Sequence, residues 1–180
     1  MKNFFQYVFI AAVITVVFGV IYASVQQSYR TGADDPQLQM VRDMNIKLHE
    51  GKSISQYFND TINIDQSLAP FNMFFDSGGK LLLSSGLLHR QLPVFPSGEF
   101  AFTRNHKENA FTWQPESGVR IAMVVKYCDT AGFIASGRSL TEVEVREHNL
   151  TTMVVIGWII CMGLLLLYSV LNYFKEKQPI

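Results

Sequence analysis

Two arginines in the middle of the chain, Arg120 and Arg138, have the chemistry needed to bind an organic acid. An arginine side chain presents a planar fork of N–H donors that matches a carboxylate. Trp113 lies shortly before Arg120, and the residues between them, Pro115–Gly118, are typical of a turn. If this turn closes a four-residue hairpin, Trp113 faces Arg120 across two strands, and the indole could stack on the guanidinium. The pattern indicates a binding site rather than a catalytic one.

The same arginines have a simpler interpretation as surface residues. Arg120 would then only cover Trp113, and Arg138 would pair with Glu142 or Glu144 in the segment that follows it. The spacing of these residues is compatible with either arrangement, so both remain open.

No group of residues has the spacing of a catalytic or metal site. The four histidines are isolated from one another: His49, His89, His106 and His148. One cysteine lies in the middle of the chain and one in an apolar run, Cys128 and Cys161, so neither an internal disulfide nor a metal pattern is expected. We therefore expect a protein that is not an enzyme and has no cofactor or metal, with an enzyme as the weakest alternative.

Composition limits the remaining classes. The chain has 180 residues and a formal net charge of zero, which argues against nucleic acid as a partner. Hydrophobic residues make up 48% and are concentrated near the two ends. This length accommodates one modest domain and two membrane spans.

The segment from Phe133 onward links the arginines to the second apolar run. Phe133–Arg138 is expected to be a strand, and Ser139 with Glu142 has the spacing of a capping box at a helix start. Neither Gly nor Pro interrupts residues 139–156, and residues 152–174 carry no charge. We expect one helix that leaves the domain and enters the membrane; the alternative is a tether with a flexible joint.

Residues 4–25 are also uncharged and are expected to be an uncleaved membrane anchor. Small residues recur there at every fourth position: Ala11, Thr15, Gly19 and Ala23. Such a ridge lets two membrane helices approach closely, which suggests a homodimer, although the ridge could equally face lipid. Basic residues flank both spans, so residues 1–3 and 175–180 are predicted to be cytoplasmic and residues 26–151 to lie outside.

The outer segment reads as helices followed by strands. Asp34 and Gln37 suggest a capping box for a helix that ends near Gly51, and Ser53 with Gln56 suggests a second, short one. The segment TINIDQSLAP reads as irregular, and residues 97–109 are expected to hold a short helix. Strands are expected at residues 71–76, 81–85, 110–114, 119–128 and 133–138, with a Gly turn at residues 77–80. In residues 119–128, odd-numbered side chains are expected on one sheet face and even-numbered ones on the other.

The stretch FNMFFDSGGKLLLSSG resembles the central hairpin of extracytoplasmic PAS-like sensor domains of the Cache or PDC type. TWQPESGVRIAMVV and AGFIASGRSLTEVE are similar to the later strands and exit helix of such domains in bacterial membrane receptors, especially histidine kinases. The resemblance covers roughly residues 30–175. It implies an α+β fold with a five-stranded antiparallel sheet, N-terminal helices, and a ligand pocket over one face. In such a pocket Arg120 and Arg138 would hold the acid, with Trp113 or Tyr127 as a wall.

These expectations together describe a sensor or accessory receptor in the bacterial inner membrane, with both termini cytoplasmic. It would bind a small ligand and pass the change through the second span. No HAMP linker, kinase or cyclase region accompanies the resemblance, so output would come from a partner or from the rest of a longer receptor. The expected partners are lipid, a second copy, or a signalling or transport protein. The alternative is a two-span structural subunit whose outer domain docks a transporter or kinase.

Overall fold

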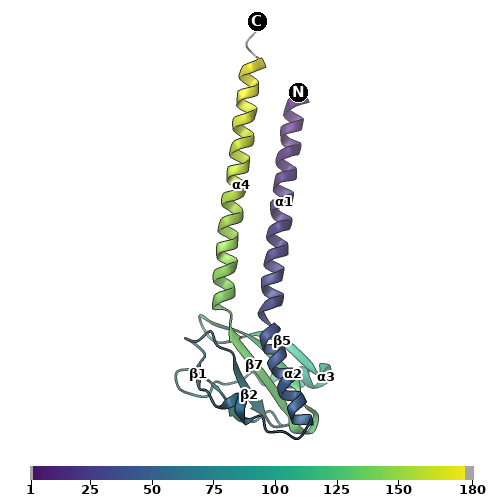
Figure 1. Ribbon diagram of the computed structural model, residues 1–180, viewed down its shortest axis with the longest axis vertical. Helices are drawn as coiled ribbons and strands as arrows, with labels where there is room; N and C mark the ends of the chain where they lie inside the picture. Colours follow the sequence, from purple (N-terminus) through teal and green to yellow (C-terminus); the bar gives the residue numbers. More distant parts are fainter. Residues whose placement is uncertain (1, 177–180) are drawn as a thin grey trace. The chain divides into compact units, whose positions relative to one another are not determined.

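The computed structural model describes residues 2–176, which divide into two compact units. One unit comprises the chain up to Tyr29 and from Val145 on, and the other comprises Arg30–Glu144. The first contains most of two long helices, α1 (Lys2–Ala33) and α4 (Thr141–Glu176) (Figure 1). Both helices are long and apolar enough to cross a membrane. Helix α4 continues without a break through the whole predicted second span, which confirms the expectation of one continuous helix.

The second unit is an α+β domain built on a five-stranded antiparallel sheet, as expected. The strand order is β3-β2-β7-β6-β5, so β7, the last strand in sequence, lies in the middle of the sheet. The strands are β2 (Phe71–Phe75), β3 (Leu81–Ser84), β5 (Glu108–Glu116), β6 (Val119–Tyr127) and β7 (Phe133–Ser139).

The β2–β3 hairpin follows from its turn chemistry. The Asp76 carboxylate oxygen Oδ1 accepts hydrogen bonds from the backbone N–H groups of Gly78 and Lys80, both at 2.9 Å. Gly79 has φ +84°, a conformation that glycine adopts without strain. The turn predicted at residues 77–80 is confirmed, and Asp76 acts as its cap.

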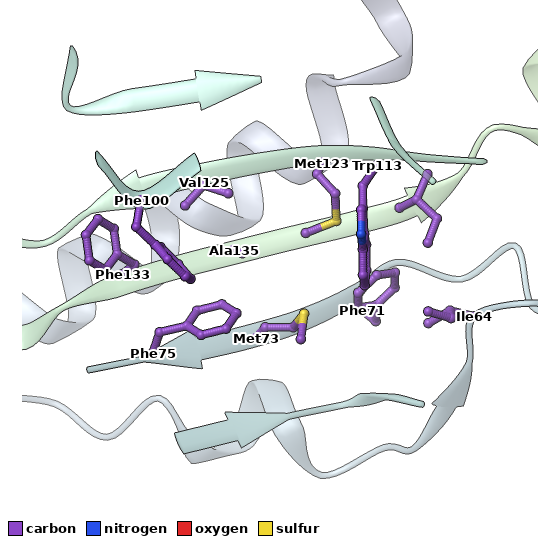
Figure 2. Close-up of a cluster of buried hydrophobic side chains, with 11 residues drawn as sticks. Ile64, Phe71, Met73, Phe75, Phe100, Trp113, Met123, Val125, Phe133 and Ala135 are labelled. Atoms are coloured by element: carbon purple, nitrogen blue, oxygen red, sulfur yellow. The ribbon is translucent and has the colours of Figure 1, made fainter. Parts of the chain in front are cut away.

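The two sheet faces carry separate cores, as the alternation in β6 predicts. Ile121, Met123 and Val125 point into one core, where α3 (Gly98–His106) contributes Phe100. Figure 2 shows Phe75, Phe100 and Phe133 at one end of this core and Phe71 with Trp113 at the other. Val124 and Ile134 point to the opposite face, where α2 (Asp35–His49) contributes Val41 and Met44. The sheet is therefore covered on both sides.

Several predicted local features are wrong. Asp34 is the N-cap residue of α2 but makes no side-chain cap bond, so the Asp34–Gln37 capping box does not form. Gln37 is instead buried, and in the amide orientation that satisfies its neighbours its nitrogen donates to the carbonyl oxygens of Ala33 and Asp34. Because α1 ends at Ala33, the carbonyl oxygen of this residue needs a donor, and the buried Gln37 amide supplies it instead of forming a capping box.

Two further segments differ from expectation. The short helix predicted from Ser53 is a 3-10 turn, η1 (Ser55–Phe58), and it has no side-chain cap. The segment predicted to be irregular contains β1 (Ile62–Asn63), which pairs in parallel with β4 (Gly86–Leu87). Strands of two residues show no periodicity in sequence, so this pair could not be anticipated.

Candidate functional site

The predicted pairing of Trp113 with Arg120 is wrong. Trp113 lies opposite Ile121, and the next paired residues of the hairpin are Glu116 and Val119, with a register irregularity between. The connection is thus a two-residue turn, with Gly118 at φ +85°, rather than the four-residue loop that would align Trp113 with Arg120. Trp113 is buried in the core that contains Phe100, whereas Arg120 alternates onto the opposite face.

The two aromatic residues proposed as pocket walls lie at different ends of one face. Tyr127 packs against Phe133 with ring centroids 5.0 Å apart. The cationic groups of Arg104 and Lys107 lie over its ring at 5.7 and 5.2 Å from the centroid. Because Tyr127 is six residues along β6 from the partner of Trp113, the two are separated by about 20 Å along the strand. The structure does not bring them together.

Arg120 and Arg138, in contrast, lie at the same end of the sheet and on the same face. The Arg138 nitrogen Nη2 donates to the Glu142 carboxylate at 2.7 Å, and Nε donates to the carbonyl oxygen of Leu68 at 3.0 Å. The Arg120 nitrogen Nη1 contacts the Glu144 carboxylate at 2.5 Å. Arg138 therefore pairs with the acidic segment that follows it, as the simpler interpretation predicted.

These ion pairs surround the point where the sheet becomes a helix, which we call the C-terminal joint (Ser139–Thr141). Ser139 is the last residue of β7, and α4 begins at Thr141, slightly later than predicted. The Leu140 N–H donates to the Arg120 carbonyl oxygen at 2.8 Å, and the Leu140 carbonyl oxygen accepts from the Glu144 N–H at 2.9 Å. One residue therefore belongs to the sheet through its N–H and to the helix through its C=O.

The predicted capping residues contribute to this joint in different ways. The Ser139 hydroxyl oxygen accepts from the Thr141 N–H at 3.3 Å. Glu142 and Glu144 place negative charge in the first turn of α4, where the helix dipole favours it. Each acid also faces an arginine from a different strand, Arg138 from β7 and Arg120 from β6. The first turn of α4 is thus attached to two strands at once.

Within the helical unit, α1 and α4 are joined by polar contacts that sequence reasoning did not identify. The Trp158 indole N–H donates to Thr15 Oγ1 at 3.0 Å, and the Asn172 amide donates to the Tyr7 hydroxyl at 3.0 Å. Polar residues inside apolar runs were the available signal, because such groups find partners across membrane helices.

The predicted small-residue ridge has two environments. Ala11 is half-buried and Thr15 accepts the bond from Trp158, so this end faces α4 of the same chain. Gly19 and Ala23 are exposed, and a Cβ added at Gly19 would meet no atom within 4 Å. Gly19 nevertheless lines an apolar groove between α1 and α4, together with Val155 and Trp158, so the ridge borders α4 of the same chain as far as Gly19.

The described residues hold no cluster of metal-ligating side chains, and the cysteine of the α+β domain is buried. Across residues 2–176, no group of three or more His, Cys, Asp or Glu side chains could hold a metal ion. Cys128 is buried, and this burial raises the pKa of its thiol to about 11. A thiol that stays protonated is a weak nucleophile, which fits a packing role.

Comparison of the chain with protein families, with curated proteins and with solved structures finds no match.

Proposed function

We propose that this protein is a membrane-anchored sensor or accessory receptor that passes a change in its outer domain through α4 to a partner protein. The observation that carries this proposal is the C-terminal joint. The central strand β7 continues into α4 with a single intervening residue, Leu140. Because no flexible linker separates the two elements, a displacement of the sheet would also displace the start of the helix.

The architecture supports the same proposal. A five-stranded antiparallel sheet with helices on both faces agrees with what the resemblance to PAS-like domains of the Cache or PDC type implies. In this proposal α1 and α4 span the inner membrane of a bacterium, both termini are cytoplasmic, and the α+β domain lies outside. No catalytic step is part of it.

The ligand in this proposal is a small organic acid that competes for the arginines of the C-terminal joint. Arg138 and Glu142 are each about one third exposed, at 33% and 32%, so water and solutes reach the pair. A bound carboxylate would take over the guanidinium forks and free Glu142 or Glu144. Since a ligand acts only through its different affinity for two states, release of the first turn of α4 would define the second state.

A panel of mono-, di- and tricarboxylates tests this ligand class on the full chain in nanodiscs. Binding should raise the unfolding temperature and speed hydrogen–deuterium exchange at residues 142–146. Arg120→Gln and Arg138→Gln should abolish both effects. Arg42→Gln is the matched control, because Arg42 pairs with Glu108 away from the joint and its loss should leave binding intact. Equal responses of all three variants would exclude the joint as the carboxylate site.

Topology is tested by thiol labelling in intact cells, starting from a variant without Cys128 and Cys161. A membrane-impermeant reagent should modify a cysteine at Val94, which is 89% exposed, and should not modify one at Gln178. The reverse pattern would contradict the orientation and the sensor proposal with it.

Homodimerisation through α1 is part of the proposal, because small exposed residues such as Gly19 and Ala23 let a second helix approach closely. Gly19→Leu should weaken association in a membrane two-hybrid assay, because the larger side chain crowds the ridge. Unchanged association would assign the ridge to lipid.

The alternative, a structural subunit whose outer domain docks a membrane protein, is favoured by one observation. Apolar side chains are exposed on the edge strand β3 and in the loop before α3: Leu82, Leu83, Leu92 and Val94. A photo-crosslinking residue at Val94 should capture a transporter or kinase if docking is the role. The sensor proposal expects instead that carboxylates alter α4 without such a partner bound.

A further inference from the structure

Three segments of the outer domain meet at His89. His89 lies in the turn after β4, Asp65 lies between β1 and β2, and Glu116 is the last residue of β5. The His89 nitrogen Nε2 is 2.9 and 3.0 Å from the two Glu116 carboxylate oxygens. The other ring nitrogen, Nδ1, is 3.6 Å from Asp65 Oδ2. Each nitrogen of one imidazole therefore faces a different carboxylate.

This arrangement requires a particular protonation state. A neutral imidazole has one N–H donor and one lone pair, whereas an imidazolium has two N–H donors. In the neutral form, one of the two nitrogens would direct its lone pair at a carboxylate, which repels it. Only the protonated ring attracts both acids.

The Asp65 carboxylate depends on this contact. Its side chain is only 13% exposed, and its second oxygen, Oδ1, is buried and has no hydrogen-bond partner among the described residues. A mostly buried carboxylate without an opposing charge is unfavourable. Loss of the His89 proton would remove the cation that faces it.

The turn that carries His89 is strained. His89 and Arg90 have φ of +50° and +65°, and Leu88 and Gln91 exchange two backbone hydrogen bonds around them. Positive φ at both central residues is the pattern of a type I′ turn, which prefers Asn-Gly. A side-chain-bearing residue keeps such a conformation only where its surroundings hold it. The contacts of His89 are well placed to supply that restraint.

The same loop reaches the core. Phe95 packs against Phe75 and Trp113, with ring centroids 5.0 and 5.6 Å away. Trp113 is on β5, three residues before Glu116, so the hairpin that holds His89 also holds a partner of Phe95. A change at His89 should therefore be felt at Trp113.

The geometry points to a proton-operated clamp: protonated His89 bridges Asp65 and Glu116 and holds the loop of residues 88–97 on the core, and loss of the proton loosens that loop. The clamp does not depend on the proposed carboxylate ligand or on signalling through α4. It assigns the outer domain a sensitivity to the pH of its surroundings.

The electrostatics of the site agree with this assignment. The hydrogen bond to Glu116 and then the charge of Glu116 raise the pKa of His89, Asp65 adds to the increase, and desolvation opposes it. Because the pKa is higher in the folded than in the unfolded state, the stabilisation is fully present below about pH 6.5, the ordinary histidine value. It is lost as pH rises through the higher, folded-state value.

The test is a histidine titration by NMR on the full chain in detergent micelles. His89 should titrate above the ordinary histidine value, and Glu116→Gln should move its midpoint down toward that value. His106→Gln is the matched control, because His106 contacts the Phe102 carbonyl oxygen rather than a carboxylate. A His89 midpoint that is ordinary, or that Glu116→Gln leaves unchanged, would overturn the clamp.

A second measurement follows the loop itself. In a Trp158→Phe background, Trp113 is the remaining tryptophan and its fluorescence reports on the Phe95 contact. The signal should change between pH 5 and 9 with the His89 midpoint, and His89→Gln should abolish that change while His106→Gln preserves it. A fluorescence change that survives in His89→Gln would show that another group controls the loop and would reject the proposal.

Discussion

The α+β domain is connected to α1 and α4 by two joints of different construction. At the N-terminal joint (Ala33–Asp35), α1 ends, Asp34 intervenes, and α2 begins without a side-chain cap. At the C-terminal joint, each acid of the first helical turn meets an arginine from the sheet. Both joints contain two acids, but only the second pairs them with cations.

This difference indicates which connection can transmit a displacement. At the N-terminal joint Asp34 and Asp35 are adjacent, and burial followed by the charge of Asp35 raises the pKa of Asp34. The N-terminal joint is instead held by the buried amide of Gln37, which donates to the carbonyl oxygens of Ala33 and Asp34. The C-terminal joint has backbone and side-chain bonds to two strands, so its position follows the sheet. In the proposed function α4 is the output helix, because its first turn carries the ion pairs to the sheet that the N-terminal joint lacks among the described contacts.

The largest expected effect comes from disturbing the strand that leads into the C-terminal joint. A Cβ added at Gly137 would clash with the Met123 sulfur and the Phe71 ring. Gly137→Ala should lower the free energy of unfolding of the α+β domain by about 3 kcal/mol, as expected for overpacking in a core. Urea unfolding followed by Trp113 fluorescence in the Trp158→Phe background measures it. Gly98→Ala is the control, because a Cβ there meets nothing within 4 Å; equal effects would show that β7 is not tightly seated.

The second prediction breaks the output while leaving the domain intact. Two glycines inserted between His148 and Asn149 should cost about 1 kcal/mol each relative to alanine and make this the weakest point of α4. Spin labels at Val145 and Ile159, both exposed, should then show a broad distance distribution in a cysteine-free chain. A dialanine insert is the matched control and should keep a narrow distribution, lengthened by about 3 Å. Narrow distributions in both chains would contradict the view of α4 as a helix that can be uncoupled here.

The third prediction removes one side-chain tie of the C-terminal joint. Arg138→Ala loses the ion pair with Glu142 and the bond to the Leu68 carbonyl oxygen, and should cost about 1 kcal/mol because both side chains are partly exposed. Hydrogen exchange at residues 142–146 should accelerate. Arg42→Ala is the control: it removes the ion pair between Arg42 of α2 and Glu108 of β5, in which the arginine is more exposed. It should cost at most about 0.5 kcal/mol and leave hydrogen exchange at residues 142–146 unchanged. If Arg138→Ala also left it unchanged, the backbone alone would hold the joint.

Sequence reasoning succeeded where a pattern is local. Alternation along β6 predicted its two faces, and the absence of Gly and Pro from residues 139–156 predicted a continuous α4. Arg138 and Glu142 are four residues apart, so their pairing could be anticipated as an alternative. These features depend on neighbours within one or two elements.

It failed where the outcome depended on register or on distant segments. The sequence of Pro115–Gly118 fits both a four-residue loop and a two-residue turn. The two-residue turn that forms places Arg120 on the opposite sheet face from Trp113. The acids around His89 lie on other segments, with Glu116 separated from it by 27 positions, so no local motif marks them. The Asp34–Gln37 spacing satisfied a capping rule, but burial of Gln37 decided its role.

The smallest effect is expected at the N-terminal joint, where Asp34→Asn should stabilise the domain by at most about 0.5 kcal/mol at pH 7. Asparagine is also a good N-cap residue, so the substitution removes charge with little change of shape. Because the pKa of Asp34 is raised in the folded state, its ionised form is unfavourable there, and the gain should shrink as pH falls through the raised folded-state pKa and be lost below the ordinary value of 3.8. Urea unfolding at pH 7 and pH 3.5 measures both. Asp35→Asn should stabilise the domain less. It removes only the charge repulsion on Asp34, which is the smaller cause of the raised pKa, and leaves the burial of Asp34 unchanged. It also removes an acid from the first turn of α2, where the helix dipole favours negative charge. A loss of stability in Asp34→Asn at pH 7 would mean that the charge of this acid holds the joint in place, and the contrast between the two joints would no longer stand.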